Sequence, residues 1–459
     1  MANYLFLRGN RNRYFFHDIA TGLMQYGHQC YQFRFELGER FLQTSMKTRF
    51  APTYVSKKEY PISDEELSRL DIYQIRYQQI KNKHVKNTKS LCLYKRYMWM
   101  LDQFIEKNQI DIICFFNGHH WLDQIAMYIA KKRQIEIRVF EEGHFRPYTI
   151  TYDRQGVNAY ASIPRERAFY QHVKVDRERY PEYVFKPESC LVQQGKKDSL
   201  SKLALIKTVN HIGSLLGIHP KLYEHSSFLE SVRYFWNKRR FAKRGEDDID
   251  WPKEYILLPF QVEHDTQILF HSPHISTMEE LLERTLMAVR EVIERENRHI
   301  HVMVKEHPEE HARNAYLDLK QKYKQDEQVI FVTKHEVEPL IEKALAIITI
   351  NSTVGIEALS QYKHVITLGE ALYNIEGIAH HCPHPSHLAE TLATVLKQEI
   401  NQELIDQFLY YLRFIYQIEG SIHLRNRETT HHIVSRMVSE QRRIQNESYR
   451  HYPSPIRVH

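Results

Sequence analysis

Short apolar runs alternate with amphipathic segments along most of the chain. In the first third, the predicted strands are Tyr4–Leu7, His28–Phe35, Asp111–Phe116 and Glu136–Phe140. A helix is expected to end near Tyr26, and a long polar helical region is expected after the second strand, up to about Asn108. Another helix at Trp121–Lys132 separates the last two strands. Strand, helix and strand at this spacing predict a parallel sheet that is covered by helices.

The same alternation returns in the second half of the chain. Strands are expected at Tyr255–Pro259, His301–Val304, Val329–Val332, Leu345–Ile350 and His364–Leu368. Helices are expected at Met278–Glu296, Glu309–Tyr323, Glu336–Ala344 and Val354–Gln361. Periodicity alone gives two α/β units. Two doubly wound units followed by C-terminal helices also match the layout of a GT-B-like fold, in which two Rossmann-like domains face a cleft and the last helices pack back.

The expected organisation has four parts. Residues 1–170 form an N-terminal Rossmann-like domain for acceptor binding and catalysis, and residues 171–250 form a charged helical insertion or linker. Residues 251–390 form a C-terminal Rossmann-like domain that binds the nucleotide, and residues 391–459 form helices with a basic tail. In doubly wound sheets, ligands bind beyond the carboxyl ends of the strands, so polar residues at those ends are the functional candidates.

Asn351-Ser352-Thr353 follows a predicted buried strand and opens a helix. Hydroxyl side chains beside the unpaired amides of a helix N-terminus offer a phosphate site. Glu357, four residues after Thr353, lies on the same helix face and can reach ribose hydroxyls. Helix capping without any ligand explains these residues equally well.

Lys305-Glu306-His307-Pro308 ends a neighbouring predicted strand. Pro308 stops the strand and starts a helix, while Lys305 and His307 can contact a phosphate. Taken singly, a strand terminator is the better explanation. Two such sites in neighbouring strand–helix units instead favour a nucleotide-binding C-terminal domain.

Glu141-Glu142-Gly143 ends the strand that begins at Glu136. Adjacent side chains on a strand point to opposite faces, so one carboxylate is expected to face the cleft unless the chain turns between them. A carboxylate opposite a nucleotide site can act as general base or covalent nucleophile. A solvated acidic turn is the competing explanation. Arg146 and Arg165 are candidate partners for an anionic substrate, and either could equally form a surface ion pair.

Composition excludes several classes of protein. The chain has 459 residues, of which 42% are hydrophobic and 26% charged, so it is long enough for a large core and is not disordered. The net charge of +6 is too small to indicate nucleic-acid binding, but it fits a surface that meets anionic partners. The five cysteines are widely spaced, without CxxC, which argues against disulfides and zinc. With neither a signal peptide nor a transmembrane run in the pattern, a cytoplasmic protein is expected.

Two further features remain open. Arg233–Arg244 interleaves basic and aromatic residues, as an interfacial helix does, although a packed and solvated helix explains it somewhat better. The pair His119-His120 and the run His380–His387 invite a metal site, but they lack carboxylates and ligand spacing. We therefore expect no metal.

Seven blocks in order carry a specific resemblance: FEEGHFRP, GVNAYASIP, LPFQVEHDTQI, HSPHIS, VKEHP, NSTVGIEAL and LGEALYNIEG. Together they resemble the bacterial capsule polysaccharide β-Kdo transferases, and more closely the single-module KpsS/LipB type. The resemblance covers roughly residues 1–390 in motif order.

The resemblance implies a retaining glycosyltransferase that moves Kdo from CMP-Kdo to a lysophospholipid acceptor, lysophosphatidylglycerol, and so starts the poly-Kdo linker of a capsule. Glu142 would be the nucleophile, in a block whose second acid is Asp in the relatives. His307, Pro308, Ser352 and Thr353 would surround the CMP phosphate.

The resemblance and the chemistry of the donor complete the candidate set. The remaining donor-binding candidates are Lys305, Asn351, Glu357 and Gln261. The candidates for the Kdo carboxylate or the acceptor are Arg146, Arg165 and Asn117. The candidates for the acceptor base are His144 and Glu141. No cofactor is expected, because these groups can carry the phosphate charge.

The implied location is the inner face of the inner membrane of a Gram-negative bacterium. The implied partners are the membrane surface, a companion Kdo-extending transferase and the capsule export complex. Two rival functions stay open. One is another CMP- or CDP-linked transferase, such as one that moves a polyol phosphate, and the other is a non-catalytic, membrane-associated capsule assembly protein.

Overall fold

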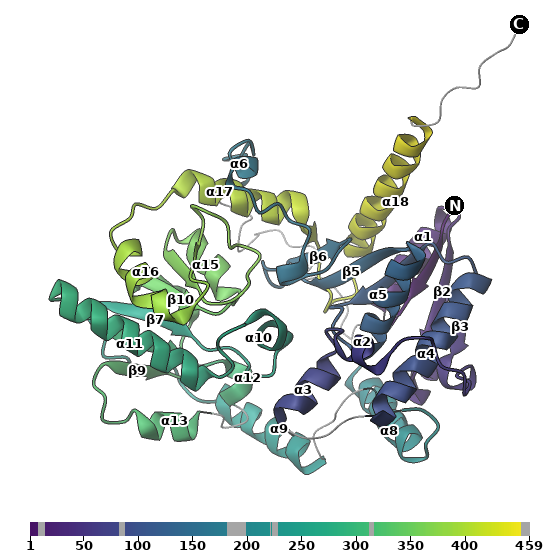
Figure 1. Cartoon of the computed structure of the whole chain (residues 1–459), viewed down its shortest axis with the longest axis horizontal. Helices are drawn as coiled ribbons and strands as arrows, with labels where there is room; N and C mark the ends of the chain where they lie inside the picture. The colour runs from purple at the N-terminus through teal and green to yellow at the C-terminus, as the bar shows by residue number, and fades with distance from the viewer. Residues whose placement is uncertain are drawn as a thin grey trace, which may run out of the picture.

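Two sheets with helices on both faces form the body of the molecule (Figure 1). The computed structural model describes residues 1–7, 14–81, 88–180, 199–220, 222, 228–311 and 316–450. The following paragraphs concern these residues. The sequence prediction of a GT-B-like α/β protein with two doubly wound units and C-terminal helices that pack back is confirmed, although the N-terminal sheet also has two antiparallel strands.

The N-terminal sheet has the strand order β13-β6-β5-β4-β1-β2-β3. Its strands are β1 (Asn3–Phe6), β2 (Gln29–Arg34), β3 (Lys47–Phe50), β4 (Ile112–Phe116), β5 (Glu136–Glu142), β6 (Thr149–Asp153) and β13 (Ile418–Glu419). Strands β1 to β5 are parallel to one another, whereas β6 runs antiparallel to β5 and β13 runs antiparallel to β6. The strand order reverses between β1 and β4, where doubly wound sheets bind ligands.

Alternating side chains of β1 divide the core of this sheet. Leu5 and Leu7 pack with α4 and α5 on one face, and Tyr4 and Phe6 pack with α1 and α18 on the other. The helices on this side of the molecule are α1 (Phe15–Gln25), η1 (Leu37–Phe41), η2 (Ala51–Thr53), α2 (Asp64–Ser68), α3 (Tyr73–Lys81), α4 (Thr88–Lys107), α5 (Trp121–Arg133), η3 (Asn158–Tyr160) and α18 (Arg427–Arg450). Helix α6 (Arg167–Tyr170) lies on the other side, where Tyr170 packs in the core of the C-terminal unit (Figure 1).

The C-terminal sheet is parallel throughout, with the order β12-β11-β10-β7-β8-β9. Its strands are β7 (Tyr255–Pro259), β8 (His301–Lys305), β9 (Val329–Val332), β10 (Ala346–Thr349), β11 (His364–Thr367) and β12 (His380–His381). Counted from β7, this is the 3-2-1-4-5-6 order of dinucleotide-binding folds, and its switch point lies between β7 and β10.

Helices cover both faces of the C-terminal sheet. Ile256 and Leu258 of β7 pack with α11 and α16, while Tyr255 and Leu257 pack with α14, α15 and α17. The remaining helices are α8 (Leu200–Leu215), α9 (Phe228–Ala242), α10 (Thr266–His271), α11 (Met278–Glu296), α12 (Pro308–His311), α13 (Leu317–Lys322), α14 (Val337–Lys343), α15 (Val354–Ser360), η5 (Pro385–His387), α16 (Leu388–Val395), α17 (Gln402–Tyr410) and η6 (Tyr411–Tyr416).

The structure adds strands that the apolar pattern does not predict, namely β3, β6, β12 and β13. Strand β3 lies within a stretch that was expected to be helical up to about residue 108, so that part of the prediction is wrong. The helix predicted at Glu309–Tyr323 is described only as α12 and α13, with residues 312–315 outside the described ranges. Parts of the predicted linker (181–198, 221 and 223–227) and the end of the basic tail (451–459) also lie outside them.

The C-terminal section returns to the N-terminal sheet. Helix α17 packs in the core of the C-terminal unit, and the chain then crosses through η6 to β13 and α18. Ile433 and Val434 of α18 are buried against Phe16 and Ile19 of α1. Among the described helices, none is both long and apolar enough to cross a membrane.

Candidate active site

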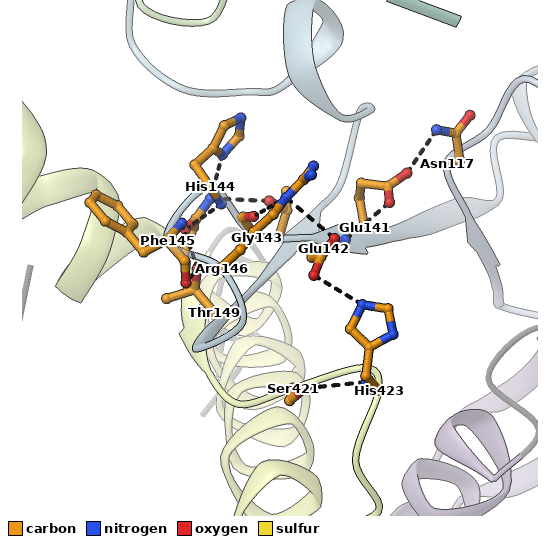
Figure 2. Close-up of polar contacts among 12 residues, drawn as sticks. Asn117, Glu141, Glu142, Gly143, His144, Phe145, Arg146, Thr149, Ser421 and His423 are labelled. Atoms are coloured by element: carbon orange, nitrogen blue, oxygen red, sulfur yellow. Dashed lines mark hydrogen bonds and ion pairs between the residues drawn. The ribbon is translucent and has the colours of Figure 1, made fainter. Parts of the chain in front are cut away.

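The paired carboxylates lie at the carboxyl end of β5. Register with the antiparallel neighbour β6 continues through both residues, Glu141 opposite Thr151 and Glu142 opposite Ile150. The strand therefore does not turn between them, and their side chains point to opposite faces. Figure 2 shows Glu141 directed toward Asn117 and Glu142 toward His423.

Glu142 is held between a histidine and an arginine. Its Oε1 lies 3.0 Å from Nε2 of His423, and its Oε2 lies 3.3 Å from Nε of Arg146. Burial by itself raises the pKa of Glu142, but the hydrogen bond from His423 and the charge of Arg146 outweigh it and lower that pKa. The same hydrogen bond raises the pKa of His423. Glu142 is thus a half-buried carboxylate that stays ionised at neutral pH.

Glu141 has a different environment. Its Oε2 accepts a 2.7 Å hydrogen bond from Nδ2 of Asn117, and its Oε1 accepts one from the backbone N–H of Glu142. Burial raises the pKa of Glu141 despite these donors. Asn117 has φ of 63°, a left-handed conformation that Asn tolerates, and its own N–H donates to the carbonyl of Phe140. The Asn117 side chain is therefore engaged with Glu141.

A tight turn after β5 brings Arg146 over Glu142. The N–H of Gly143 donates to the carbonyl of Thr149 at 2.8 Å, and the N–H of Phe145 donates to Oγ1 of Thr149. A Cβ atom at position 143 would lie 2.1 Å from that Oγ1, so the turn requires glycine. Arg146, half exposed, also donates to the carbonyl of Gly143.

His423 comes from the far end of the chain, and sequence reasoning missed it. Strand β13 pairs with β6, and the N–H of Gly420 then donates to the carbonyl of Tyr148. The N–H of His423 donates to Oγ of Ser421, which fixes the loop next to Glu142. Glu142 and His423 are 281 residues apart in sequence, and no motif or spacing signals their contact.

His144 is buried away from this carboxylate. Its Nδ1 lies 2.6 Å from Nε2 of Gln417, and its N–H donates to Oε1 of the same residue. Burial and then the charge of Arg146 lower the pKa of His144 to about 3, so the ring is neutral. His144 joins the turn to the segment that leads into β13.

The second group of candidates lies at the carboxyl end of β8. Lys305 donates from Nζ to the carbonyls of Glu306 and Thr333, and burial lowers the pKa of Lys305. Nδ1 of His307 accepts a hydrogen bond from the N–H of Glu309, which leaves Nε2 to carry the ring hydrogen. Burial lowers the pKa of His307, so it is a neutral donor at pH 7. Pro308 begins α12, as the sequence predicts.

The third group follows β10. Asn351 and Gln261 are buried and bonded to each other, with Nε2 of Gln261 donating to Oδ1 of Asn351 at 3.0 Å. Oγ of Ser352 accepts from the N–H of Val354, and Thr353 precedes α15 without capping it through its side chain. Burial raises the pKa of Glu357. The structure therefore places Ser352, Thr353 and Glu357 around the start of α15, with Asn351 and Gln261 beneath.

The two sheets present these groups to one another. Burial lowers the pKa of His307 and raises that of Glu357; the charge of Arg146 adds to the first shift and opposes the second, so its guanidinium lies within electrostatic range of both groups as well as of Glu142. Arg165 spans the two halves differently, because its guanidinium donates to the carbonyls of Ala159 and Ala371. The structure brings Arg146 to Glu142 and engages Arg165 with the backbone at this junction.

The histidines that suggested a metal site pack as rings. His119 stacks on Phe270 with ring centroids 4.6 Å apart, and its centroid is 5.6 Å from that of His271. Burial, with the neighbouring His271, lowers the pKa of His119 to about 4. In the described ranges no group of three or more His, Cys, Asp or Glu residues is arranged to hold a metal ion.

Comparison with curated proteins finds relatives in capsule synthesis. The chain is 28% identical over 306 residues to the capsule polysaccharide export protein KpsS of Escherichia coli, covering 61% of this chain and 72% of that protein. It is 26% identical over 298 residues to the capsule polysaccharide modification protein LipB of Neisseria meningitidis serogroup A, covering 62% and 70%.

Among solved structures, the chain is similar to the β-Kdo 2,7 transferase of KpsC from Thermosulfurimonas dismutans. The two are 16% identical with a TM-score of 0.33, over 83% of this chain and 98% of that one. A likeness at this level says nothing about activity. The family model of capsule polysaccharide biosynthesis proteins matches residues 111–422, a span that holds the β4 and β5 ends, β13 and the whole C-terminal sheet. The chain therefore belongs to the capsule polysaccharide biosynthesis protein family.

Proposed function

We propose that this protein is a retaining β-Kdo glycosyltransferase that transfers Kdo from CMP-Kdo to a lysophospholipid, with Glu142 as the nucleophile. The observation that carries the proposal is the state of Glu142. Its carboxylate is kept ionised by His423 and Arg146 at the carboxyl edge of one sheet, and Arg146 is within electrostatic range of His307 on the other. The membership in a capsule synthesis family supports the choice of chemistry.

Retention by double displacement proceeds in two steps. In the first, an oxygen of Glu142 attacks the anomeric carbon of Kdo, and the bond to the phosphate breaks, with its electron pair leaving on CMP. In the second, the acceptor hydroxyl loses a proton and attacks the same carbon, which frees the carboxylate. Glu142 has the low pKa that a nucleophilic carboxylate needs, whereas the raised pKa of Glu141 favours a supporting role.

The donor phosphate is assigned to the C-terminal edge. His307 has a free Nε2–H to donate, and the hydroxyls of Ser352 and Thr353 lie at the start of α15. Lys305 adds positive charge beneath them, although its ammonium already donates to two carbonyls. These groups need no metal to offset the charge of the departing CMP.

Arg146 is the candidate for the carboxylate of Kdo. It now pairs with Glu142 and is half exposed, so an incoming carboxylate can share its guanidinium. Asn351 and Gln261 satisfy each other and backbone groups, so we assign them to holding the loop beneath the donor.

His423 is the candidate base for the acceptor. Its pKa is raised because it hydrogen-bonds the Glu142 carboxylate. When that carboxylate becomes an ester to Kdo, the negative charge disappears and the pKa of His423 falls. The ring then gives up its own proton to solvent, and although the lower pKa makes it a weaker base, its neutral form is available to take the proton of the acceptor hydroxyl. Of the bases that the sequence suggested, His144 is buried and Glu141 is partly buried, and both are hydrogen-bonded elsewhere.

The acceptor and the location complete the proposal. We propose lysophosphatidylglycerol as the acceptor, at the inner face of the inner membrane, beside a companion Kdo-extending transferase and the capsule export complex. The support is the relationship to KpsS and LipB, whose names place them in capsule export and modification.

The test is intact-protein mass spectrometry after incubation with freshly generated CMP-Kdo and no acceptor. A mass gain of one Kdo residue is expected, on the peptide that holds Glu141 and Glu142. Glu142→Gln should lose the adduct, and the matched control Glu141→Gln should keep it. An adduct that survives in Glu142→Gln contradicts the assignment of the nucleophile.

A second arm separates the rival donors. If no adduct forms but CMP is released when lysophosphatidylglycerol is added, the transferase stands and the double displacement fails. If neither occurs, CMP- or CDP-linked polyols become the donors to assay, because a polyol-phosphate transferase would use the same phosphate groups without needing Glu142.

A further inference from the structure

The positive charge of the chain is concentrated in one segment. Residues 200–244 contain nine Lys or Arg and two Glu, a net charge of +7, whereas the whole chain carries +6. The rest of the molecule is therefore close to neutral. This segment includes α8 and α9, which lie along the same edge of the molecule, the lower one in Figure 1.

Helix α8 presents apolar side chains on two sides. One side is buried on η1, where Ile206 packs and Oδ1 of Asn210 accepts the N–H of Gly38 at 2.6 Å. On the other side, Leu205, Ile212 and Leu216 follow the spacing of one helix face and are 51%, 47% and 70% exposed. Exposed apolar residues that adjoin this stripe are Leu215 (73%) and Ile218 (40%). The α8 sequence has no acidic residue.

Helix α9 is anchored by one side and basic on the other. Tyr234 and Lys238 both bind Glu309 of α12, with the Lys238 ammonium 2.6 Å from Oε1. By helical spacing, the opposite side carries Trp236, which is 65% exposed, together with Arg239, Arg240 and, just after the helix, Lys243. A tryptophan among arginines and lysines is the composition of membrane interfaces.

We propose that α8 and α9 form a docking surface for an anionic lipid membrane. The apolar stripe of α8 and the side chain of Trp236 enter the headgroup region, and the basic residues of α9 bind lipid phosphates. An anionic polymer would pair with the basic residues but would leave the apolar side chains of α8 exposed to water. The apolar stripe therefore favours a lipid membrane over an anionic polymer. The inference rests on the proposed function only in supposing that the acceptor is a lipid. Membrane binding itself needs neither donor nor turnover.

The experiment is flotation of the full-length protein with vesicles, without CMP-Kdo. One set of vesicles is phosphatidylcholine alone, and the other mixes phosphatidylcholine with phosphatidylglycerol. We expect binding to the mixed vesicles that weakens as NaCl rises, and a blue shift of fluorescence that Trp236→Phe removes. Leu215→Gln with Leu216→Gln should weaken the affinity by at least about tenfold, because each leucine loses apolar burial.

Matched variants control for exposure and for folding. Met287→Gln with Leu317→Gln alters side chains that are 63% and 61% exposed on α11 and α13, and it should bind as wild type does. Arg240→Gln with Lys243→Gln should reduce the salt dependence. Leucine variants that bind as tightly as wild type would overturn the proposal, as would binding to dextran sulfate but not to the mixed vesicles.

A final measurement separates this proposal from the catalytic one. With soluble short-chain lysophosphatidylglycerol as acceptor, CMP release by the leucine variant should equal that of wild type, since α8 is no part of the site. Vesicle binding without any CMP release supports the docking surface and counts against the transferase. CMP release from CMP-Kdo in the presence of the soluble acceptor, without vesicle binding, supports the transferase and counts against the docking surface.

Discussion

The turn between β5 and β6 fixes the candidate nucleophile, and Gly143→Ala tests how tightly. A Cβ atom at this position would lie 2.1 Å from Oγ1 and 2.6 Å from the carbonyl carbon and oxygen of Thr149, where ordinary contacts begin at 3.4 Å. The two strands must therefore separate by about 1 Å next to Glu142, and overpacking of this kind costs about 1–3 kcal/mol.

The cost to activity should exceed the cost to stability. A shift of about 1 Å in a reacting group lowers rates by about 100-fold. We expect Gly143→Ala to lower the urea midpoint modestly and to lower CMP release from CMP-Kdo by about that factor. Both are measured on the same preparation, with circular dichroism to verify the fold.

Two further variants sharpen the result. Gly245→Ala is the matched control, because nothing lies within 4 Å of its added Cβ and its φ is not in the left-handed range. Adding Thr149→Ala to Gly143→Ala removes Oγ1 but leaves the carbonyl, so rescue should be partial at most. If Gly143→Ala matches Gly245→Ala in both stability and rate, the turn does not position Glu142 and the reasoning is refuted.

Two predictions concern pH. In His423→Gln, the pKa of Glu142 loses its largest lowering partner and rises, so the acid limb of the kcat/KM profile should move to higher pH; an unmoved limb would contradict the pairing. Burial lowers the pKa of His119 from 6.5 to about 4 in the folded protein. As the pH falls from 6.5 to 4, the unfolded chain therefore takes up a proton on His119 before the folded protein does. The folded protein loses stability over this pH range, by roughly 3 kcal/mol at most. Urea denaturation of His119→Phe at pH 7 and pH 5 should show a smaller loss than wild type.

The strands that sequence reasoning found are those whose stability comes from their own apolar residues. The run YILLP is buried along its whole length, so its side chains alone predict β7. Strands β12 and β13 have two residues each and become strands only because a neighbour offers its edge. Local pattern contains no information about such pairing.

The candidate site divides in the same way. Glu142, His307 and Ser352 directly follow or end predicted strands, so topology alone places each of them at the carboxyl edge of its own sheet. Their partners depend on folding at long range, and His423 is the clearest case, because a two-residue strand delivers it to Glu142. Sequence reasoning also had no means to see that Asn117 would be engaged by Glu141.

The position of β13 late in the sequence has a consequence for synthesis on the ribosome. The β1–β6 portion of the N-terminal sheet can assemble while the rest of the chain is still being made, but its last strand and the histidine beside Glu142 are encoded beyond residue 416. A nascent chain therefore holds the candidate nucleophile long before it holds His423. Under the proposed mechanism, activity appears only after the entire C-terminal sheet has been translated.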